Sequence, residues 1–213
     1  MRRVCVALLA MALPLSVGST LAPPGLSGEE SPQTKTPRRE VFLSCAPGAS
    51  GLLTLRFPGR YVLASDLRGL VIEVASPGVT LDLAGHEITA NEATAGAITV
   101  RPEGIGTVIR GGVISGSPGW GIDARAARGC RIEGITLRGN AAGGVRIGPG
   151  GLVRHCAVEG PGPAIAVTGV GAWIAENDLC ESERGLEIVG TDNVVAANRS
   201  GRLSVGGGNW LAD

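Results

Sequence analysis

The adjacent residues His155 and Cys156 are the first place in this sequence where reactive side chains come together. A thiol beside an imidazole can act as a nucleophile with its general base, and the same pair can bind a metal ion. The chain has one other histidine, His86. Three candidate carboxylates lie in the next repeat: Glu176, Asp178 and Glu181. The chemistry open to these groups depends on the elements that position them.

A repeat organises the chain around this pair. Six segments begin with an apolar residue, at Leu83, Ile109, Ile132, Val153, Ile174 and Val195, and the last three intervals are each 21 residues. Each segment is accompanied by a second short run of alternating apolar residues, at 97–100, 121–124, 144–147, 164–167, 185–188 and 202–205. Glycine and asparagine, which tolerate positive φ, stand at the corners. No repeat has room for a crossover helix.

These features predict an all-β fold, a right-handed parallel β-helix of about six coils with an atypical N-terminal cap. A single coil cannot bury its own apolar face, so coils must stack at about 4.8 Å and share a core. We expect a signal peptide over 1–22, a flexible Pro- and Ser-rich linker over 23–39, and the β-helix over 40–213, with repeats at about 79–205. The expected location is therefore secreted or periplasmic.

Charge and hydropathy argue against two classes of partner. The 19 basic and 19 acidic residues give zero formal net charge, so no basic footprint for nucleic acid is expected. After the signal region, no stretch reaches the roughly 18 apolar residues that a membrane span requires.

The segments GRYVLASDL (59–67) and VTLDLAGHEITA (79–90), followed by the repeats, resemble secreted bacterial right-handed parallel β-helix repeat proteins. That group has the pectate-lyase-like fold and includes the carbohydrate-binding and sugar-hydrolysis domain and periplasmic relatives associated with nitrous oxide reductase. The resemblance covers roughly 59–205. It implies coils whose corners stack inward-facing asparagines into a ladder, and polysaccharide partners. It does not specify an activity, because many functions share the fold.

Stacking changes the interpretation of His155 and Cys156. Residues at the same offset in adjacent repeats become neighbours, which places Cys156 between Ile135 and Asn177 as a small buried corner residue. His155 lies beside Glu176, and the two can pair either as acid and base or as a cap on the turn. The cysteines at 45, 130, 156 and 180 are expected to be mostly unpaired, although Cys45 could reach one of the others. No metal-ligand spacing is present, so neither a metal nor another cofactor is expected.

One outward column breaks the otherwise polar pattern of the coil surface. It carries Asp82, Val108, Arg131, Leu152, Trp173 and Val194. The last three are consecutive apolar residues, and an exposed apolar surface of this kind needs a cover. The segment 40–57, a second subunit or a ligand could supply it. An aromatic face flanked by polar groups suits a sugar ring, so the expected binding residues are Trp173, Arg131, Arg154, Leu152 and Val194.

We therefore expect an exported, non-catalytic β-helix scaffold that binds a glycan or serves a surface or structural role. The alternative is a polysaccharide lyase, hydrolase or epimerase at a shallow face near Trp173, with His155, Glu176 and Asp178 as the candidate catalytic residues. A third hypothesis is metal delivery through His86, His155 or Cys156. Expected partners are a polysaccharide, or a second copy of the chain held through the Leu152/Trp173/Val194 stripe or an open solenoid end.

Overall fold

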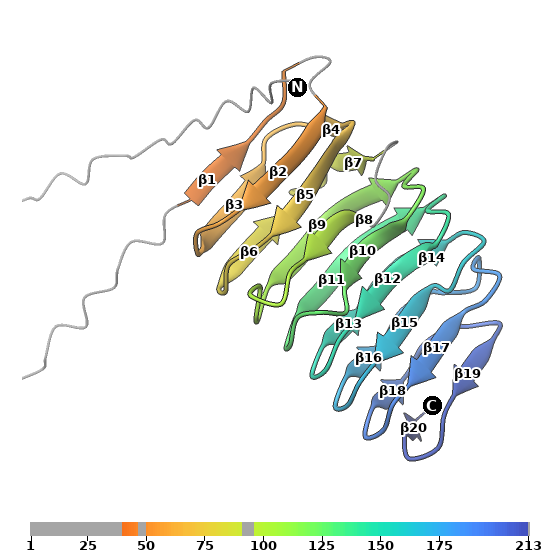
Figure 1. The fold of residues 1–213 in the computed structure, drawn as a ribbon. Coiled ribbons are helices and arrows are strands. Elements are labelled where there is room, and N and C mark those ends of the chain that lie inside the picture. The colour runs from red at the N-terminus through yellow and green to blue at the C-terminus, as the bar shows by residue number, and fades with distance from the viewer. Residues whose placement is uncertain (1–39, 47–49, 91–95, 213) are drawn as a thin grey trace, which may run out of the picture.

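The computed structural model describes residues 40–46, 50–90 and 96–212. The expected signal peptide and linker lie outside the described residues. Parallel strands stack as a β-solenoid of about eight turns (Figure 1). Among the described residues, no helix is long and apolar enough to cross a membrane.

One face of each turn belongs to a twelve-stranded sheet. Its main path runs β1 (Glu40–Leu43), β3 (Gly59–Leu63), β6 (Val79–Asp82), β9 (Val108–Ser115), β11 (Arg131–Arg138), β13 (Leu152–Arg154), β16 (Trp173–Ala175), β18 (Val194–Ala196) and β20 (Trp210–Ala212). The strands β4 (Leu67–Arg68), β7 (Glu87–Thr89) and β14 (Ala157–Glu159) lie off this path and pair with one another or with β9 and β11.

A second face forms an eight-stranded sheet. In order its strands are β19 (Leu203–Val205), β17 (Leu186–Val189), β15 (Ile165–Thr168), β12 (Gly143–Ile147), β10 (Trp120–Ala124), β8 (Gly96–Val100), β5 (Leu70–Val74) and β2 (Gly51–Leu55). Every pair between neighbouring strands is parallel, as a solenoid requires. The predicted fold class is therefore confirmed.

The solenoid begins earlier than the sequence repeat. Strand β1 pairs with β3 and β3 with β6, in a register that aligns Leu43 with Leu63 and Tyr61 with Leu81. The segment expected to form the atypical cap therefore adds further coils, because its alternating apolar residues continue the inward columns. The expected register of the first repeat is wrong by two residues, since Leu81 and not Leu83 pairs with Ile109. Thr80 therefore pairs with Val108 in the outward column expected to hold Asp82, and Asp82 pairs with Arg110.

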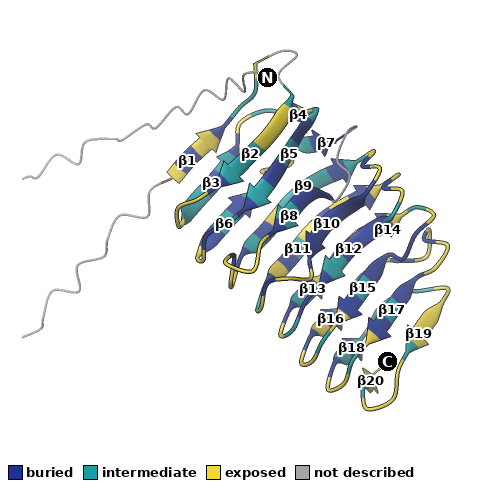
Figure 2. Ribbon diagram, in the orientation of Figure 1, coloured by how far each residue is buried: buried dark blue, intermediate teal, exposed yellow. Residues whose placement is uncertain are grey.

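The core is aliphatic and runs from Val41 to Val195, whereas the last strands, β19 and β20, are mostly exposed (Figure 2). In the inward column of the twelve-stranded sheet, Leu81, Ile109, Ile132, Val153 and Ile174 are each 0% exposed. Burying one such side chain stabilises the fold by about 1.5–3 kcal/mol.

The corner beside that column uses a left-handed backbone in successive coils. Gly111 and Gly134 have φ of 66° and 61°, and the equivalent residues of later coils, His155, Glu176 and Ala197, have φ of 53°, 58° and 52°. The next residue inward forms the expected asparagine ladder. Asn177 Oδ1 accepts the backbone N–H of Cys156 at 2.9 Å, and Asn198 Oδ1 accepts that of Asn177 at 3.0 Å.

A second ladder lies at the start of the strands of the twelve-stranded sheet. Asn193 Oδ1 accepts the backbone N–H of Ala172 at 2.9 Å, and Asn209 Oδ1 accepts that of Asn193 at 3.0 Å. Asn193 and Asn209 form this second ladder outside the offsets at which the repeat predicted asparagine. Both ladders satisfy backbone groups at bends, where the sheet hydrogen bonds are interrupted.

Candidate functional site

The outward apolar column predicted on the twelve-stranded sheet is present, and it is longer than expected. Leu152 pairs in register with Trp173, Trp173 with Val194, and Val194 with Trp210. Trp173 is 54% exposed and Trp210 is 70% exposed. We call Leu152, Trp173, Val194 and Trp210 the apolar stripe. The sequence pattern did not place Trp210 in this column, because the predicted repeats end at about residue 205.

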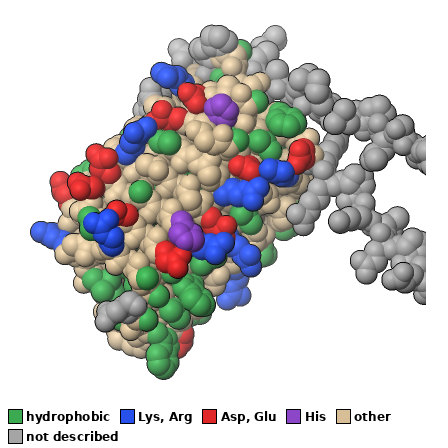
Figure 3. Space-filling view, turned by 180° about the vertical axis from the view of Figure 1, so that it is seen from behind, with side chains coloured by type: hydrophobic (Ala, Val, Ile, Leu, Met, Phe, Trp, Pro, Cys, Tyr) green, Lys and Arg blue, Asp and Glu red, His purple; other side chains and the backbone are tan. Residues whose placement is uncertain are grey.

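Small residues flank the apolar stripe. The neighbouring outward positions in its last three strands are Ala175, Ala196 and Ala212. Seen from behind, hydrophobic side chains gather at the lower end of the molecule, over the C-terminal coils (Figure 3). The two tryptophans therefore stand above a low, uncharged surface.

The expectation that segment 40–57 covers the stripe is wrong for its described residues. Strand β1 pairs with β3 and β2 with β5, so both lie in the first coils, at the opposite end from β16 and β18 (Figure 1). The physical reason is that VFL and LTL have the alternation of inward columns. These residues form strands of the first coils, so they cannot also fold over a distant face.

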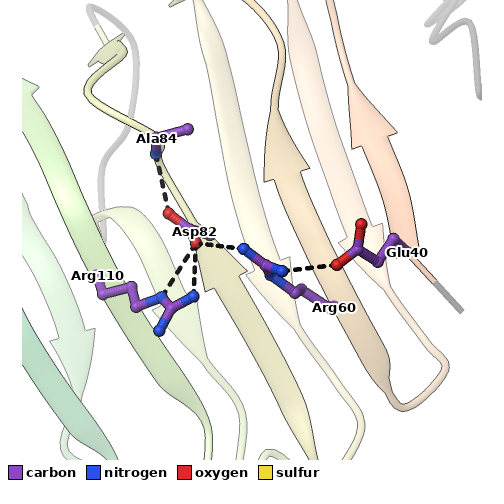
Figure 4. Close-up of polar contacts among 5 residues, drawn as sticks. All are labelled: Glu40, Arg60, Asp82, Ala84 and Arg110. Carbon is purple, nitrogen blue, oxygen red and sulfur yellow. Dashed lines mark hydrogen bonds and ion pairs between the residues drawn. The ribbon is translucent and has the colours of Figure 1, made fainter. Parts of the chain in front are cut away.

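At the N-terminal end, the same face carries paired charges. The guanidinium of Arg60 lies between Glu40, at 2.6 Å, and Asp82, at 3.0 Å (Figure 4). Asp82 also accepts two hydrogen bonds from Arg110, at 2.8 and 3.0 Å, and one from the backbone N–H of Ala84. We call Glu40, Arg60, Asp82 and Arg110 the charged ladder.

The carboxylate of Asp82 is the most buried charge in that ladder, with a side chain 14% exposed. Burial opposes its ionisation, but the hydrogen bonds from Arg110, Arg60 and the Ala84 amide outweigh burial and lower the pKa of Asp82. The ladder is thus held together by hydrogen-bonded charges.

Of the expected binding residues, the two arginines lie at the boundary between the charged ladder and the apolar stripe. Arg131 is exposed and pairs in register with Leu152. The guanidinium of Arg154 lies 3.3 Å from Glu133 in the preceding coil, as the alternating charges indicated. Both arginines can therefore reach a ligand at the N-terminal end of the stripe.

The expected pairing of His155 with Glu176 is confirmed. The Nε2 atom of His155 lies 2.5 Å from a Glu176 carboxylate oxygen, and each side chain is 56% exposed. Asp178 is not part of this pair, because its carboxylate accepts a hydrogen bond from Arg199 at 2.9 Å. The three catalytic candidates are therefore divided between two separate exposed ion pairs, His155 with Glu176 and Asp178 with Arg199.

Cys156 points away from its neighbouring histidine and into the core. It is 2% exposed, and its thiol donates to the Arg154 carbonyl at 3.3 Å. Burial raises the pKa of the Cys156 thiol to about 11, so a thiolate nucleophile does not form near neutral pH. The interpretation as a buried corner residue is confirmed. Cys130, Cys156 and Cys180 are free thiols, as expected.

His86 and His155 lie on different coils, each beside its own carboxylate. His86 Nδ1 is 3.3 Å from Asp66, which also accepts the Glu87 backbone N–H. This backbone bond, followed by the bond from His86, lowers the pKa of Asp66. Across the described residues, no group of three His, Cys, Asp or Glu side chains is arranged to hold a metal ion.

The eight-stranded sheet carries a hollow of about 460 Å³ that sequence reasoning missed. Among the residues lining it are Trp120, Arg125, Arg146, Pro163, Ala166, Arg184, Glu187 and Val189. One of its contacts was visible in the sequence, since Asp123 and Arg146 share an outward column. The hollow itself depends on small residues meeting across coils, and no single motif displays that.

Comparison with known proteins gave no match to any protein-family model, to curated proteins or to solved structures.

Proposed function

We propose that this chain is an exported, non-catalytic scaffold that binds a neutral polysaccharide along the apolar stripe. The observation that carries the proposal is the register of two exposed tryptophans, Trp173 and Trp210, in one outward column with Val194 between them. Two steps of strand spacing separate them by about 10 Å. In an extended β-1,4-linked chain, alternate pyranose rings present the same face one disaccharide apart, a similar spacing.

The surroundings of the stripe favour a sugar over a charged ligand. Ala175, Ala196 and Ala212 keep the surface beside the tryptophans low and uncharged, so rings can stack on the indoles. Arg131 and Arg154 at one end, with Glu176 beside the stripe, supply hydrogen-bonding groups for hydroxyls. Apolar stacking with a few polar groups is the usual composition of a carbohydrate site.

The alternative proposal, a polysaccharide lyase, hydrolase or epimerase, is favoured by the close His155–Glu176 pair, in which Glu176 follows Trp173 by three residues in the same coil. Glycoside hydrolysis uses two carboxyl groups that flank the scissile bond. Here Glu176 is paired with His155 and Asp178 with Arg199, and both pairs are exposed. The pairs are adequately explained as caps of neighbouring turns, so we favour binding without turnover.

Binding can be tested by measuring retention of the protein on cellulose, xylan and chitin, and by titration with their soluble oligomers. We expect Trp173→Ala and Trp210→Ala each to weaken binding by roughly three- to tenfold. Phe57→Ala is the matched control, because Phe57 is 74% exposed but lies near the first coils. The proposal fails if both tryptophan variants bind like wild type.

Two further measurements separate the other candidate functions. If wild type cleaves a polysaccharide and releases new chain ends, and Glu176→Ala does not, the protein is an enzyme and the proposal of binding without turnover is wrong. A concentration-dependent dimer in sedimentation analysis that Trp173→Ala dissociates would instead identify a second copy of the chain as the cover of the stripe.

A further inference from the structure

The hollow on the eight-stranded sheet lies on a different sheet from the apolar stripe and has a different chemistry. Its central outward column runs from Asp123 through Arg146 and Ala166 to Glu187. The methyl group of Ala166 leaves a gap between the longer Arg146 and Glu187 side chains. Pro163 and Arg184 border one side of this gap, and Thr168 and Val189 the other.

Arg146 is held in a fixed orientation at the edge of the hollow. Its guanidinium lies 4.4 Å from the ring centroid of Trp120, and its Nη1 atom lies 3.5 Å from an Asp123 carboxylate oxygen. The side chain is 24% exposed, so it is neither free in solvent nor sealed in the core. The Trp120 ring and the Asp123 carboxylate restrict the rotamers of Arg146 before any ligand binds. Ligand binding therefore costs less side-chain entropy than it would at a freely moving arginine.

The support beneath Arg146 depends on a glycine. A Cβ atom at Gly143 would approach the Trp120 ring to 2.6 Å and the Pro163 carbonyl oxygen to 2.6 Å. The absence of that atom lets the indole of Trp120 lie across the next coil, where it is 8% exposed. Trp120 is therefore a buried platform for the arginine.

Cations exceed anions around the hollow. The guanidinium groups of Arg125, Arg146 and Arg184 face the carboxylates of Asp123 and Glu187, which leaves one positive charge uncompensated. Glu187 is already bonded to Arg184 at 2.6 Å. Asp123 is shared between Arg125 and Arg146 at 3.5 Å each, longer than a charge-assisted hydrogen bond. Donors of Arg146 consequently remain available on the side of the hollow.

We infer that this hollow binds an oxyanion carried on a compact ring-sized body, with Arg146 as the residue that receives the anion. A guanidinium offers paired N–H groups that match carboxylate, sulfate and phosphate oxygens. Pro163, Ala166 and Val189 provide the apolar wall for the body of the ligand. The site is independent of the apolar stripe and of the function proposed for it.

The test is calorimetric titration of the whole chain with four matched probes: glucuronate, glucose 6-sulfate, glucose 6-phosphate and glucose. We expect at least one of the three anions to bind, glucose not to bind, and the affinity to fall as sodium chloride is raised. The pattern among the anions identifies the oxyanion. Equal binding of glucose, or no binding of any anion at millimolar concentration, would overturn the inference.

Variants assign the binding to this hollow. We expect Arg146→Gln to weaken anion binding at least tenfold, and Arg146→Lys, which keeps the charge but loses the planar fork, to weaken it several-fold. Ala166→Leu should abolish binding by filling the hollow without altering any charge, so it tests the site even if Arg146→Gln perturbs folding. Arg131→Gln, on the other sheet, is the control. Anion affinity unchanged in both Arg146→Gln and Ala166→Leu would refute the assignment.

Discussion

The two ends of the outward face of the twelve-stranded sheet are built on the same backbone and present different surfaces. From β1 to β9 the outward side chains include the paired charges of the charged ladder, beside Phe42 and Val62, and from β13 to β20 they include the apolar stripe. Both ends have the same parallel pairing and the same aliphatic interior. Because the coil constrains only its inward positions, the outward positions are free to differ between the two ends, and the proposed binding function rests on the apolar end.

The corners also differ between the middle coils and the C-terminal coils. In the coils of β9 and β11 the left-handed corner position is Gly111 or Gly134, whereas the later coils place His155, Glu176 and Ala197 there. The later coils also carry the ladder formed by Asn177 and Asn198. A left-handed conformation costs a residue with a Cβ atom roughly 1–2 kcal/mol. The later corners thus bear a strain that asparagine hydrogen bonds offset.

The largest effect should follow from breaking that ladder. Asn177→Ala leaves the buried Cys156 N–H and Val153 carbonyl without the amide that now bonds both, at 2.9 and 3.0 Å. We expect a loss of about 3 kcal/mol in the free energy of unfolding, measured by urea denaturation. Thr191→Ala, an exposed position in the next coil, is the control. A loss below about 1 kcal/mol would show that the ladder does not support the later corners.

A smaller effect is expected at the charged end. Asp82→Asn weakens the bonds to Arg60 and Arg110 around a mostly buried side chain, and we expect a loss of about 1–2 kcal/mol in urea denaturation. Asp178→Asn is the matched variant, because its pair with Arg199 is 48% and 74% exposed, and it should change stability by less than about 0.5 kcal/mol. Equal losses would mean that burial does not distinguish these pairs.

The same comparison predicts a dependence on pH. Because the pKa of Asp82 is lowered in the folded state, its stabilising effect is complete above the pKa of an unfolded aspartate, about 3.9, and is lost as pH falls through the lower folded value. The difference in stability between wild type and Asp82→Asn should therefore be constant near neutral pH and shrink below about pH 4. Urea denaturation at a series of pH values measures it, and a difference that grows in acid would contradict the prediction.

The smallest effects are expected from exchanging corner residues between the middle coils and the C-terminal coils. Gly134 has φ of 61° with no atom near its absent Cβ, so Gly134→Ala should cost about 1 kcal/mol through backbone strain alone. Ala197→Gly should have the opposite sign and stabilise by up to about 1 kcal/mol, since it relieves strain at φ of 52°. Thermal unfolding of both variants tests this, and changes of the same sign would disprove it.

Inward positions were predictable because each coil places a buried apolar residue at the same offset. The column through Ile109, Ile132 and Val153 was assigned from apolar spacing alone, and the register confirms it. The assignment failed at Leu83, where additional corner residues shift the register by two, and spacing cannot distinguish a longer corner from a longer strand. The N-terminal coils were underestimated because β1 and β3 lack the glycine corners that made later repeats visible.

The candidate sites were predictable only where they follow one column. The apolar stripe and the His155–Glu176 pair lie at single offsets, so aligning the repeats brought their members together. The hollow combines Trp120, Arg146 and Ala166 from three coils at two different offsets. Its volume depends on the small size of residues such as Ala166 and Gly143. Such a depression becomes evident only when the coils are stacked in space.

Because Trp173, Val194 and Trp210 are in register on successive coils, the distance between the two tryptophans is a whole number of coil spacings. Duplicating one coil between the tryptophans would leave the inward packing pattern intact and move the two indoles apart by one further increment of about 4.8 Å. Removing a coil would bring them closer by the same amount. If the stripe binds a polysaccharide as proposed, gain or loss of repeats would change the repeat length of the polymer that fits it in discrete steps, with no new side chain required.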